Sequence, residues 1–191
     1  DQLILIENDE NADAHLKFFN SDGGVSDACG NGTRCVADLI SKENDNKTII
    51  LTTQSRNLKS EILGNNLVTT EIGNAKTKWN EIPLSDELDT KNLNIKINDL
   101  NKNEHFGGTA INVGNPHVIF FVDEIKNFDI TKIGPQVENY KIFPEKCNVT
   151  IAQVINKNLI KVKVWERGAG LTKACGTAAC ATAFAGKLNN L

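Results

Sequence analysis

The sequence predicts an α+β protein with two pseudo-symmetric domains, each a mainly antiparallel or mixed β-sheet accompanied by one principal helix. Short apolar or alternating runs joined by turn sequences indicate hairpins, whereas parallel strands need long crossover connections. The tripeptide Ala-Cys-Gly precedes a helical pattern twice, at residues 28–30 and 174–176. The stretch from 73 to 83 is largely polar, so we place a boundary there and expect domains at residues 1–80 and 81–191.

The first half is expected to be strand-rich with one helix. The predicted strands are Leu3–Glu7, Leu16–Asn20, Thr48–Thr53, Leu58–Leu63 and Leu67–Ile72. Gly64-Asn65-Asn66 joins the last two as a good hairpin turn. The segment Thr33–Lys42 is predicted to be helical because its apolar residues recur at helical spacing.

The second half repeats this pattern. The predicted strands are Thr109–Val113, His117–Val122, Asn148–Ile155 and Leu159–Trp165. One helix is expected to begin after Asp129, an acceptable N-cap. A second helix is expected from Thr177 to about Leu188, after the Gly-rich turn Gly168-Ala169-Gly170.

Composition excludes several classes of protein. The chain has 191 residues, 40% of them apolar, which is ordinary for a folded domain and unlike a disordered chain. No apolar run approaches the roughly 20 residues of a membrane span. The formal charge is −3 without a basic block, so neither a nucleic-acid nor a membrane partner is expected. Five Cys, an odd number, and no visible leader favour reduced thiols in a cytoplasmic protein.

Two of the five cysteines stand out because each precedes Gly and opens a helix. These are Cys29 and Cys175. A helix N-terminus lowers the pKa of a thiol from about 8.5, since unpaired backbone N–H groups and the helix dipole stabilise the thiolate. The following Gly lets a ligand approach the backbone, so each turn is predicted to pair a titratable thiol with a site for a carboxylate.

Facing each other across a shared cleft, the two turns would place thiols on opposite sides of one carbon. One thiolate would remove a proton from one face while the other thiol delivers a proton to the opposite face. That exchange inverts a stereocentre, and the helix N-termini would stabilise the carboxylate as it gains enolate charge. This chemistry requires neither a metal nor an organic cofactor, and none is expected.

The other three cysteines, Cys35, Cys147 and Cys180, are interpreted as small buried apolar residues. A zinc site built from the four cysteines of the two helix starts is the alternative. It is disfavoured because the spacings C-x5-C and C-x4-C differ from the tight pairs of structural zinc sites.

Several motifs together resemble the signatures of the diaminopimelate epimerase family. The first is FNSDG at 19–23 followed by CGNGTRC at 29–35, and the second is GNPH at 114–117. The third is ERGAG at 166–170 followed by ACGT at 174–177. Asp1-Gln2 and CNV at 147–149 also fit, and the matches run in the family's order from the first residue nearly to the last.

The resemblance implies a fold in which each sheet wraps around a central helix, and the activity of an isomerase. The family interconverts LL- and meso-2,6-diaminopimelate without pyridoxal phosphate, in lysine and peptidoglycan-precursor biosynthesis, and implies a homodimer. Cys29 and Cys175 would be the acid/base pair, and His117 and Glu166 would tune their protonation. The residues implied to bind substrate are Gln2, Asn20, Gly30, Asn31, Asn115, Asn148, Glu166, Arg167, Gly176 and Thr177.

Two departures from the family pattern are visible. Ala178 occupies a position where the family usually has Gly. No His-Gly-x-Gly-Asn-Asp-Phe-type motif precedes the first strand, the chain has no Met, and it stops at Leu191 where family members usually continue. We therefore expect the sequence to be a fragment that lacks the N-terminal strand motif and the C-terminal end.

Two alternatives remain beside this interpretation. Proline or hydroxyproline racemases also use two Cys, but typically have His after the first Cys-Gly, where this chain has Asn31. A non-catalytic binding or thiol-redox protein would need Cys29 and Cys175 to form a disulfide or to lie far apart.

Overall fold

The computed structural model describes residues 2–19, 23–26, 29–54 and 56–191. The chain divides into two compact units, Asp1–Gly73 and Asn74–Leu191. This division lies in the polar stretch where we placed the boundary, a few residues before position 80. Asn20, a predicted substrate ligand at the end of a predicted strand, lies outside the described residues.

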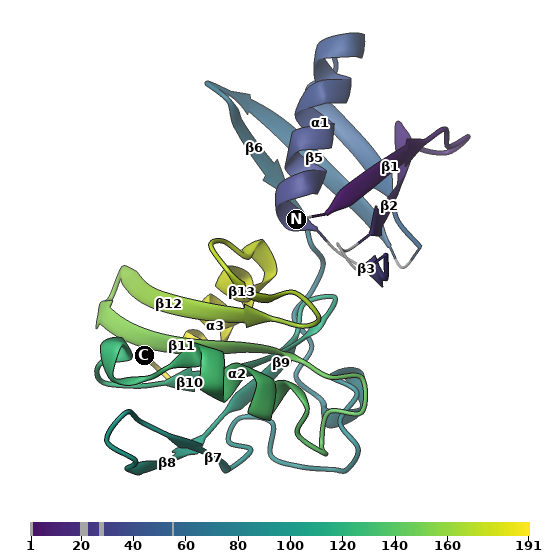
Figure 1. Cartoon of the computed structure of the whole chain (residues 1–191). Helices are drawn as coiled ribbons and strands as arrows, with labels where there is room; N and C mark the ends of the chain where they lie inside the picture. Colours follow the sequence, from purple (N-terminus) through teal and green to yellow (C-terminus); the bar gives the residue numbers. More distant parts are fainter. Residues whose placement is uncertain (1, 20–22, 27–28, 55) are drawn as a thin grey trace. The chain divides into compact units, whose positions relative to one another are not determined.

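The first unit is a mixed sheet covered by one helix (Figure 1). Its strands are β1 (Leu3–Glu7), β2 (Ala14–Phe19), β3 (Val25–Ser26), β4 (Thr48–Thr52), β5 (Asn57–Gly64) and β6 (Leu67–Thr70). The order is β1-β2-β4-β5-β6, with β3 paired to β2. Strands β2 and β4 run parallel and all other pairs are antiparallel.

The helix of this unit, α1 (Gly30–Asn44), connects β3 to β4 and packs on β4, β5 and β6. It buries Val36 and Ala37 against a core that includes Phe18 and Leu51. The helix ends at Asp45, whose left-handed φ of 56° stops the helical repeat. Its polar outer face is solvated, as the pattern of apolar residues predicted.

The second unit contains a five-stranded sheet of order β13-β12-β11-β10-β9 and a separate hairpin, β7-β8. The strands are β7 (Ile95–Asn98), β8 (Glu104–Gly107), β9 (Thr109–Asn112), β10 (Pro116–Phe121), β11 (Asn148–Asn156), β12 (Leu159–Glu166) and β13 (Gly170–Thr172). The helical segments are α2 (Ile130–Glu138), α3 (Gly176–Leu188) and the short turns η1 (Trp79–Glu81) and η2 (Ile125–Asn127). Among the described strands of this unit, β10 and β11 pair in parallel and the other pairs are antiparallel.

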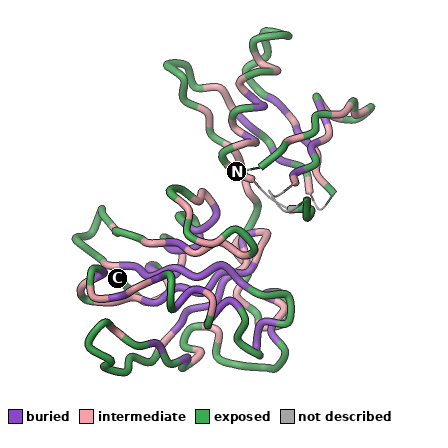
Figure 2. The backbone as a smooth tube through the Cα atoms, viewed as in Figure 1, coloured by how far each residue is buried: buried purple, intermediate pink, exposed green. Residues whose placement is uncertain are grey.

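The helices α2 and α3 pack on the five-stranded sheet with different sets of residues. The α2 residues Ile133 and Val137 share one core with Val118 and Val149 of the central strands. Successive strand residues point to opposite faces, so His117 lies on the other face, the one that α3 covers through its contacts with β9 to β12. Figure 2 shows buried residues concentrated along the central strands of this sheet.

The predicted α+β class with two sheet-rich domains is confirmed, and most predicted strands lie within a few residues of the observed ones. Strands β3 and β13 and the β7-β8 hairpin were not predicted from the sequence. Strands β3 and β13 are too short to show alternation, and β7 was overlooked because Asn residues flank Ile95 and Ile97. Within the described part of the chain, no helix is long and apolar enough to cross a membrane.

Candidate active site

The site in the first unit is built on the start of α1. Cys29 is the N-cap, with extended φ and ψ of −140° and 88°, and its Sγ accepts the backbone N–H of Gly32 at 3.4 Å. The carbonyl of Cys29 accepts both the backbone N–H of Thr33 at 2.8 Å and its hydroxyl at 2.9 Å. The half-buried thiol therefore takes the place of the Ser or Asp side chain that usually caps a helix.

Gly32 lies in tight packing around this thiol. A Cβ on Gly32 would lie 2.3 Å from Cδ1 of Ile4 and 3.0 Å from Sγ of Cys29. The Ile4 side chain of strand β1 thus lies so close to the helix start that a side chain at position 32 would require it to move. The CGNG sequence has a local steric reason here, apart from ligand binding.

Other predicted ligands of this unit lie around the same helix turn or at the chain start. Gly30, half-buried, is the first helical residue, and Asn31 is exposed with its Oδ1 accepting from Nη2 of Arg34 at 2.8 Å. Gln2 is exposed and directly precedes β1. The structure therefore gathers Cys29, Gly30 and Asn31 at one helix N-terminus.

The site in the second unit is built on the start of α3. Cys175 is the N-cap with φ and ψ of −139° and 111°, and its Sγ lies 3.4 Å from Oγ1 of Thr177. Gly176 is the first helical residue. The pKa of the Cys175 thiol is raised to about 11, mainly by burial and in smaller part by the nearby Glu166. The Thr177 hydroxyl and the Ala178 backbone N–H act in the opposite direction, each with a smaller effect than burial.

The expectation that the helix N-terminus lowers the thiol pKa was therefore wrong for Cys175. The helix N-terminus does supply an N–H that favours the thiolate, as predicted, and Ala178 supplies it without the family's Gly. The desolvation of the sulfur and the carboxylate of Glu166 outweigh that contribution. In this state Cys175 is a thiol at neutral pH, which is the protonation state of a proton donor.

Glu166 reaches this thiol from the end of β12. Its Oε1 accepts the hydroxyl of Thr172 at 2.5 Å, and both its charge and a hydrogen bond act on Cys175. The structure thus brings Glu166, Thr177 and Cys175 together, as the predicted pocket requires. Thr172, which anchors the carboxylate, was missed because a single Thr after a Gly-rich turn carries no sequence signal.

Asn148 and Arg167 form a second cluster beside this one. Asn148 is 2% exposed, donates from Nδ2 to the Pro116 carbonyl at 2.9 Å, and accepts the backbone N–H of Arg167 at 3.0 Å. Nη1 of Arg167 donates to the carbonyl of Glu145 at 3.0 Å. In this structure the amide of Asn148 ties the starts of β10 and β11 to the end of β12.

His117 is fully buried and contacts Asn115. Its Nε2 lies 2.9 Å from Oδ1 of Asn115. An amide oxygen only accepts, so Nε2 carries the proton and donates it, while Nδ1 has no protein partner among the described residues. Burial, with a smaller effect from the charge of Arg167, lowers the pKa of His117 to about 3. The ring is therefore neutral and orients the Asn115 amide, and its action on the thiols stays a prediction.

The remaining cysteines differ from one another. Cys147 is fully buried, as predicted, and burial raises its pKa. The prediction of burial was wrong for Cys35 and Cys180, which are exposed on the outer faces of α1 and α3. Other residues of the two helices, such as Val36 and Ala181, are buried in their place. The small size of Cys does not indicate which face of a helix it occupies. In the described ranges, no group of three or more His, Cys, Asp or Glu could hold a metal ion.

Known proteins similar to this chain agree with one another. The family model for diaminopimelate epimerase matches residues 1–78 and 109–191. A diaminopimelate epimerase from Pelagibacter ubique is 68% identical over the whole chain, which covers 70% of that protein. A diaminopimelate epimerase from Acidiphilium cryptum is 41% identical over 95% of the chain, which covers 64% of that protein. The chain thus spans about two thirds of the length of these relatives.

Solved structures with low sequence identity share the fold. A hydroxyproline epimerase from Agrobacterium vitis has a TM-score of 0.64 at 12% identity, over 99% of this chain and 60% of that one. A phenazine biosynthesis protein from Bacillus anthracis has a TM-score of 0.61 at 14% identity, over 97% of this chain and 65% of that one. Identities this low establish the fold alone. The family model and the curated relatives together establish that the chain belongs to the diaminopimelate epimerase family.

Proposed function

We propose that this protein is a cofactor-independent isomerase that interconverts LL- and meso-2,6-diaminopimelate. The observation that carries the proposal is that each unit begins its principal helix with a half-buried Cys as N-cap, at Cys29 and at Cys175. Membership of the family supports the substrate. The proposed setting is the cytoplasm, in lysine and peptidoglycan-precursor biosynthesis, with the protein acting as a homodimer and without a nucleic-acid or membrane partner.

The proposed chemistry uses the two sulfurs in opposite protonation states. The Sγ of Cys29 accepts a backbone N–H, an interaction that favours a thiolate over a thiol. In one direction that thiolate would take the Cα proton, and the Cys175 thiol would deliver its proton to the opposite face. The two sulfurs exchange their protonation states, and the reverse reaction uses them in exchanged roles. Catalysis by one correctly placed acid or base contributes about 10²- to 10⁴-fold.

Backbone N–H groups of the two helix starts are proposed to hold the reacting carboxylate. Gly30-Asn31 and Gly176-Thr177 present these groups beside each sulfur. The same N–H groups would stabilise the carboxylate as it takes up enolate charge, where one donor is worth roughly 2.7–4 kcal/mol.

The distal end of the substrate is assigned to polar residues of both units. Arg167 suits a carboxylate because its guanidinium donates two parallel hydrogen bonds, and Glu166 suits the substrate's ammonium group. The other proposed ligands are Gln2, Asn20, Asn115 and Asn148.

A stereochemical assay tests the function. The purified protein is incubated with LL-diaminopimelate and, separately, with L-proline and trans-4-hydroxy-L-proline, and the epimers are separated by chiral chromatography. Conversion of diaminopimelate alone is expected. Cys29→Ala and Cys175→Ala should each lose at least about 100-fold in kcat, whereas Cys35→Ser and Cys180→Ser, at exposed positions, should retain it.

Other outcomes would overturn the proposal. Turnover of proline or hydroxyproline without diaminopimelate would assign the runner-up, a racemase of that type. Undiminished epimerisation by both Cys→Ala variants would exclude the two-thiol chemistry. Since the two thiols act as a unit, the double variant should lose no more than the worse single variant.

A further inference from the structure

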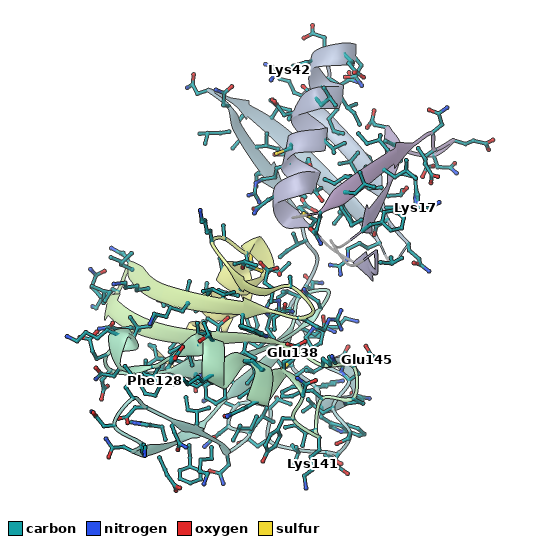
Figure 3. The ribbon with its side chains drawn as sticks, in the orientation of Figure 1. Lys17, Lys42, Phe128, Glu138, Lys141 and Glu145 are labelled. Carbon is teal, nitrogen blue, oxygen red and sulfur yellow. The ribbon has the colours of Figure 1, made fainter. Side chains whose placement is uncertain are left out.

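A buried carboxylate beneath the Glu166–Arg167 turn was not among the predicted site residues. Glu138 is the last residue of α2 and is 6% exposed; Figure 3 labels it at the end of that helix. Two features of this location are unfavourable. An anion at a helix C-terminus opposes the helix dipole, and a buried carboxylate loses its hydration. Specific donors must therefore compensate for both.

The compensating donors come from the two residues that flank Glu166 and Arg167. Nε1 of Trp165 donates to Oε2 of Glu138 at 2.7 Å, and the backbone N–H of Gly168 donates to Oε1 at 3.1 Å. Nζ of Lys146 is more distant, at 4.0 Å from Oε1. Each carboxylate oxygen thus accepts one hydrogen bond, from either side of the pair of site residues.

The turn itself has backbone features that make this support effective. Gly168 and Gly170 have φ of 72° and 81°, so the chain reverses through the left-handed region between β12 and β13. The N–H of Ala169 bonds to the carbonyl of Glu166 at 3.1 Å, which leaves the Gly168 N–H to point at Glu138. The Trp165 ring packs on Gly134 of α2, where a Cβ would come within 2.3 Å of the ring.

We propose that Glu138 is a positioning residue, whose carboxylate holds the Trp165–Gly168 turn and so directs Glu166 at the Cys175 thiol and Arg167 at the substrate. Strand residues alternate in direction. With Trp165 fixed on the α2 face, Glu166 must point to the face where Thr172 and Cys175 lie. The proposal rests on the proposed function for its effect on turnover, but not for its effect on the Cys175 thiol.

The test uses Glu138→Gln and Trp165→Phe, with Glu104→Gln as the matched control. The glutamine is isosteric but has one acceptor oxygen, so it cannot accept from both Trp165 and Gly168. Phe keeps the packing on Gly134 and removes one donor. Glu104 lies on the surface hairpin, where it pairs with Lys96. The first readout is the pH dependence of Cys175 alkylation by iodoacetamide, followed by mass spectrometry, which requires no diaminopimelate.

Displacement of Glu166 should move the alkylation midpoint of Cys175 to lower pH in Glu138→Gln, and less so in Trp165→Phe. In the same variants kcat for diaminopimelate should fall between about 10- and 100-fold at temperatures well below unfolding, as expected for a small misplacement of site residues. Glu104→Gln should change neither quantity. A lowered melting temperature with an unchanged Cys175 profile in both variants would overturn the proposal. Should diaminopimelate not be turned over at all, the alkylation profile still decides the role of Glu138.

Discussion

The two helix starts share the sequence Ala-Cys-Gly but create different environments for their sulfurs. At α1 the Cys29 sulfur accepts the N–H of Gly32, and the aliphatic side chain of Ile4 lies against the same glycine. At α3 the Cys175 sulfur contacts a hydroxyl and a carboxylate, and its pKa is raised to about 11. The same Ala-Cys-Gly tripeptide therefore gives its sulfur different neighbours at the two helices, and at Cys175 these neighbours favour the thiol. This difference arises from the surrounding residues rather than from the motif.

The two sites also differ in how rigidly they are supported. In the second unit, the turn that carries Glu166 is fixed through a buried carboxylate and a packed indole. In the first unit, the side chain that lies nearest to Gly32 at the helix start is the flexible end of Ile4. Three predictions test these differences, and one concerns the buried His117 of the second unit.

The largest expected effect is on stability, from a Gly→Ala substitution in each unit. A Cβ at Gly134 would lie 2.3 Å from Cγ and 2.7 Å from Cβ of Trp165, which cannot move without displacing the β12 backbone. We expect Gly134→Ala to destabilise the protein by about 3 kcal/mol, despite the roughly 1 kcal/mol gain from helix propensity. Gly32→Ala should cost about 1 kcal/mol, since Ile4 can rotate away. Urea denaturation measures both, and equal costs would contradict the difference in rigidity.

The next effect concerns the thiols. With a pKa of about 11, Cys175 is roughly 0.1% thiolate at pH 8, against about a quarter for an ordinary thiol. We expect iodoacetamide to alkylate Cys175 at least about 100-fold more slowly than free cysteine at pH 8, and more slowly than Cys29. The measurement uses a Cys35→Ser/Cys180→Ser background, because those exposed thiols would consume reagent. Alkylation of Cys175 as fast as Cys29 would remove the contrast between the two sites.

A third effect is the pH dependence of stability caused by His117. Its pKa is about 3 in the folded protein and 6.5 in the unfolded chain, so the unfolded chain binds the proton first as pH falls. The stabilising contribution is complete above pH 6.5 and is lost as pH falls toward 3. Between pH 7 and pH 5 the loss should be about 2 kcal/mol. Replacement by Gln should remove this loss, and a variant with the same pH slope would show that folding does not lower the pKa of His117.

The smallest effect isolates Glu166. Its charge and hydrogen bond raise the pKa of Cys175, but burial is the larger cause. Glu166→Gln should therefore accelerate alkylation of Cys175 at pH 8 only several-fold, without reaching the rate of a free thiol. Glu104→Gln, on the surface, serves as the control. A full recovery of free-thiol reactivity would mean that the carboxylate, rather than desolvation, dominates.

The sequence predicted the parts of this molecule that depend on local pattern. Hairpins such as β11-β12, the N-cap of α2 at Asp129 and the two Cys-led helix starts follow from turn residues and periodicity. The short strand β13 and the buried Glu138 do not, because both exist only through contacts distant in sequence. Cys35 and Cys180 were misplaced for a related reason, since a small side chain suits either face of a helix.

The raised pKa of Cys175 shows in general what a sequence motif cannot predict about a titratable group. A helix N-terminus is visible in the sequence, and its effect on a thiol has a known direction. Desolvation by the packing of the sheet and α3 is not visible, and here it reverses the outcome. A motif thus identifies a titratable group, while its protonation state depends on tertiary surroundings.

The most direct test of the two-thiol account is isotope partitioning in deuterated water. The reaction with LL-diaminopimelate is stopped before a tenth of the equilibrium amount of meso product has formed. The deuterium content at Cα is then measured separately in the meso product and in the recovered substrate. Two thiols on opposite faces predict product that is deuterated at the inverted Cα and recovered substrate that retains protium, because the donor sulfur carries a deuteron from the solvent. Product that retains the original proton, or substrate that exchanges faster than product forms, would indicate a single base and contradict the account.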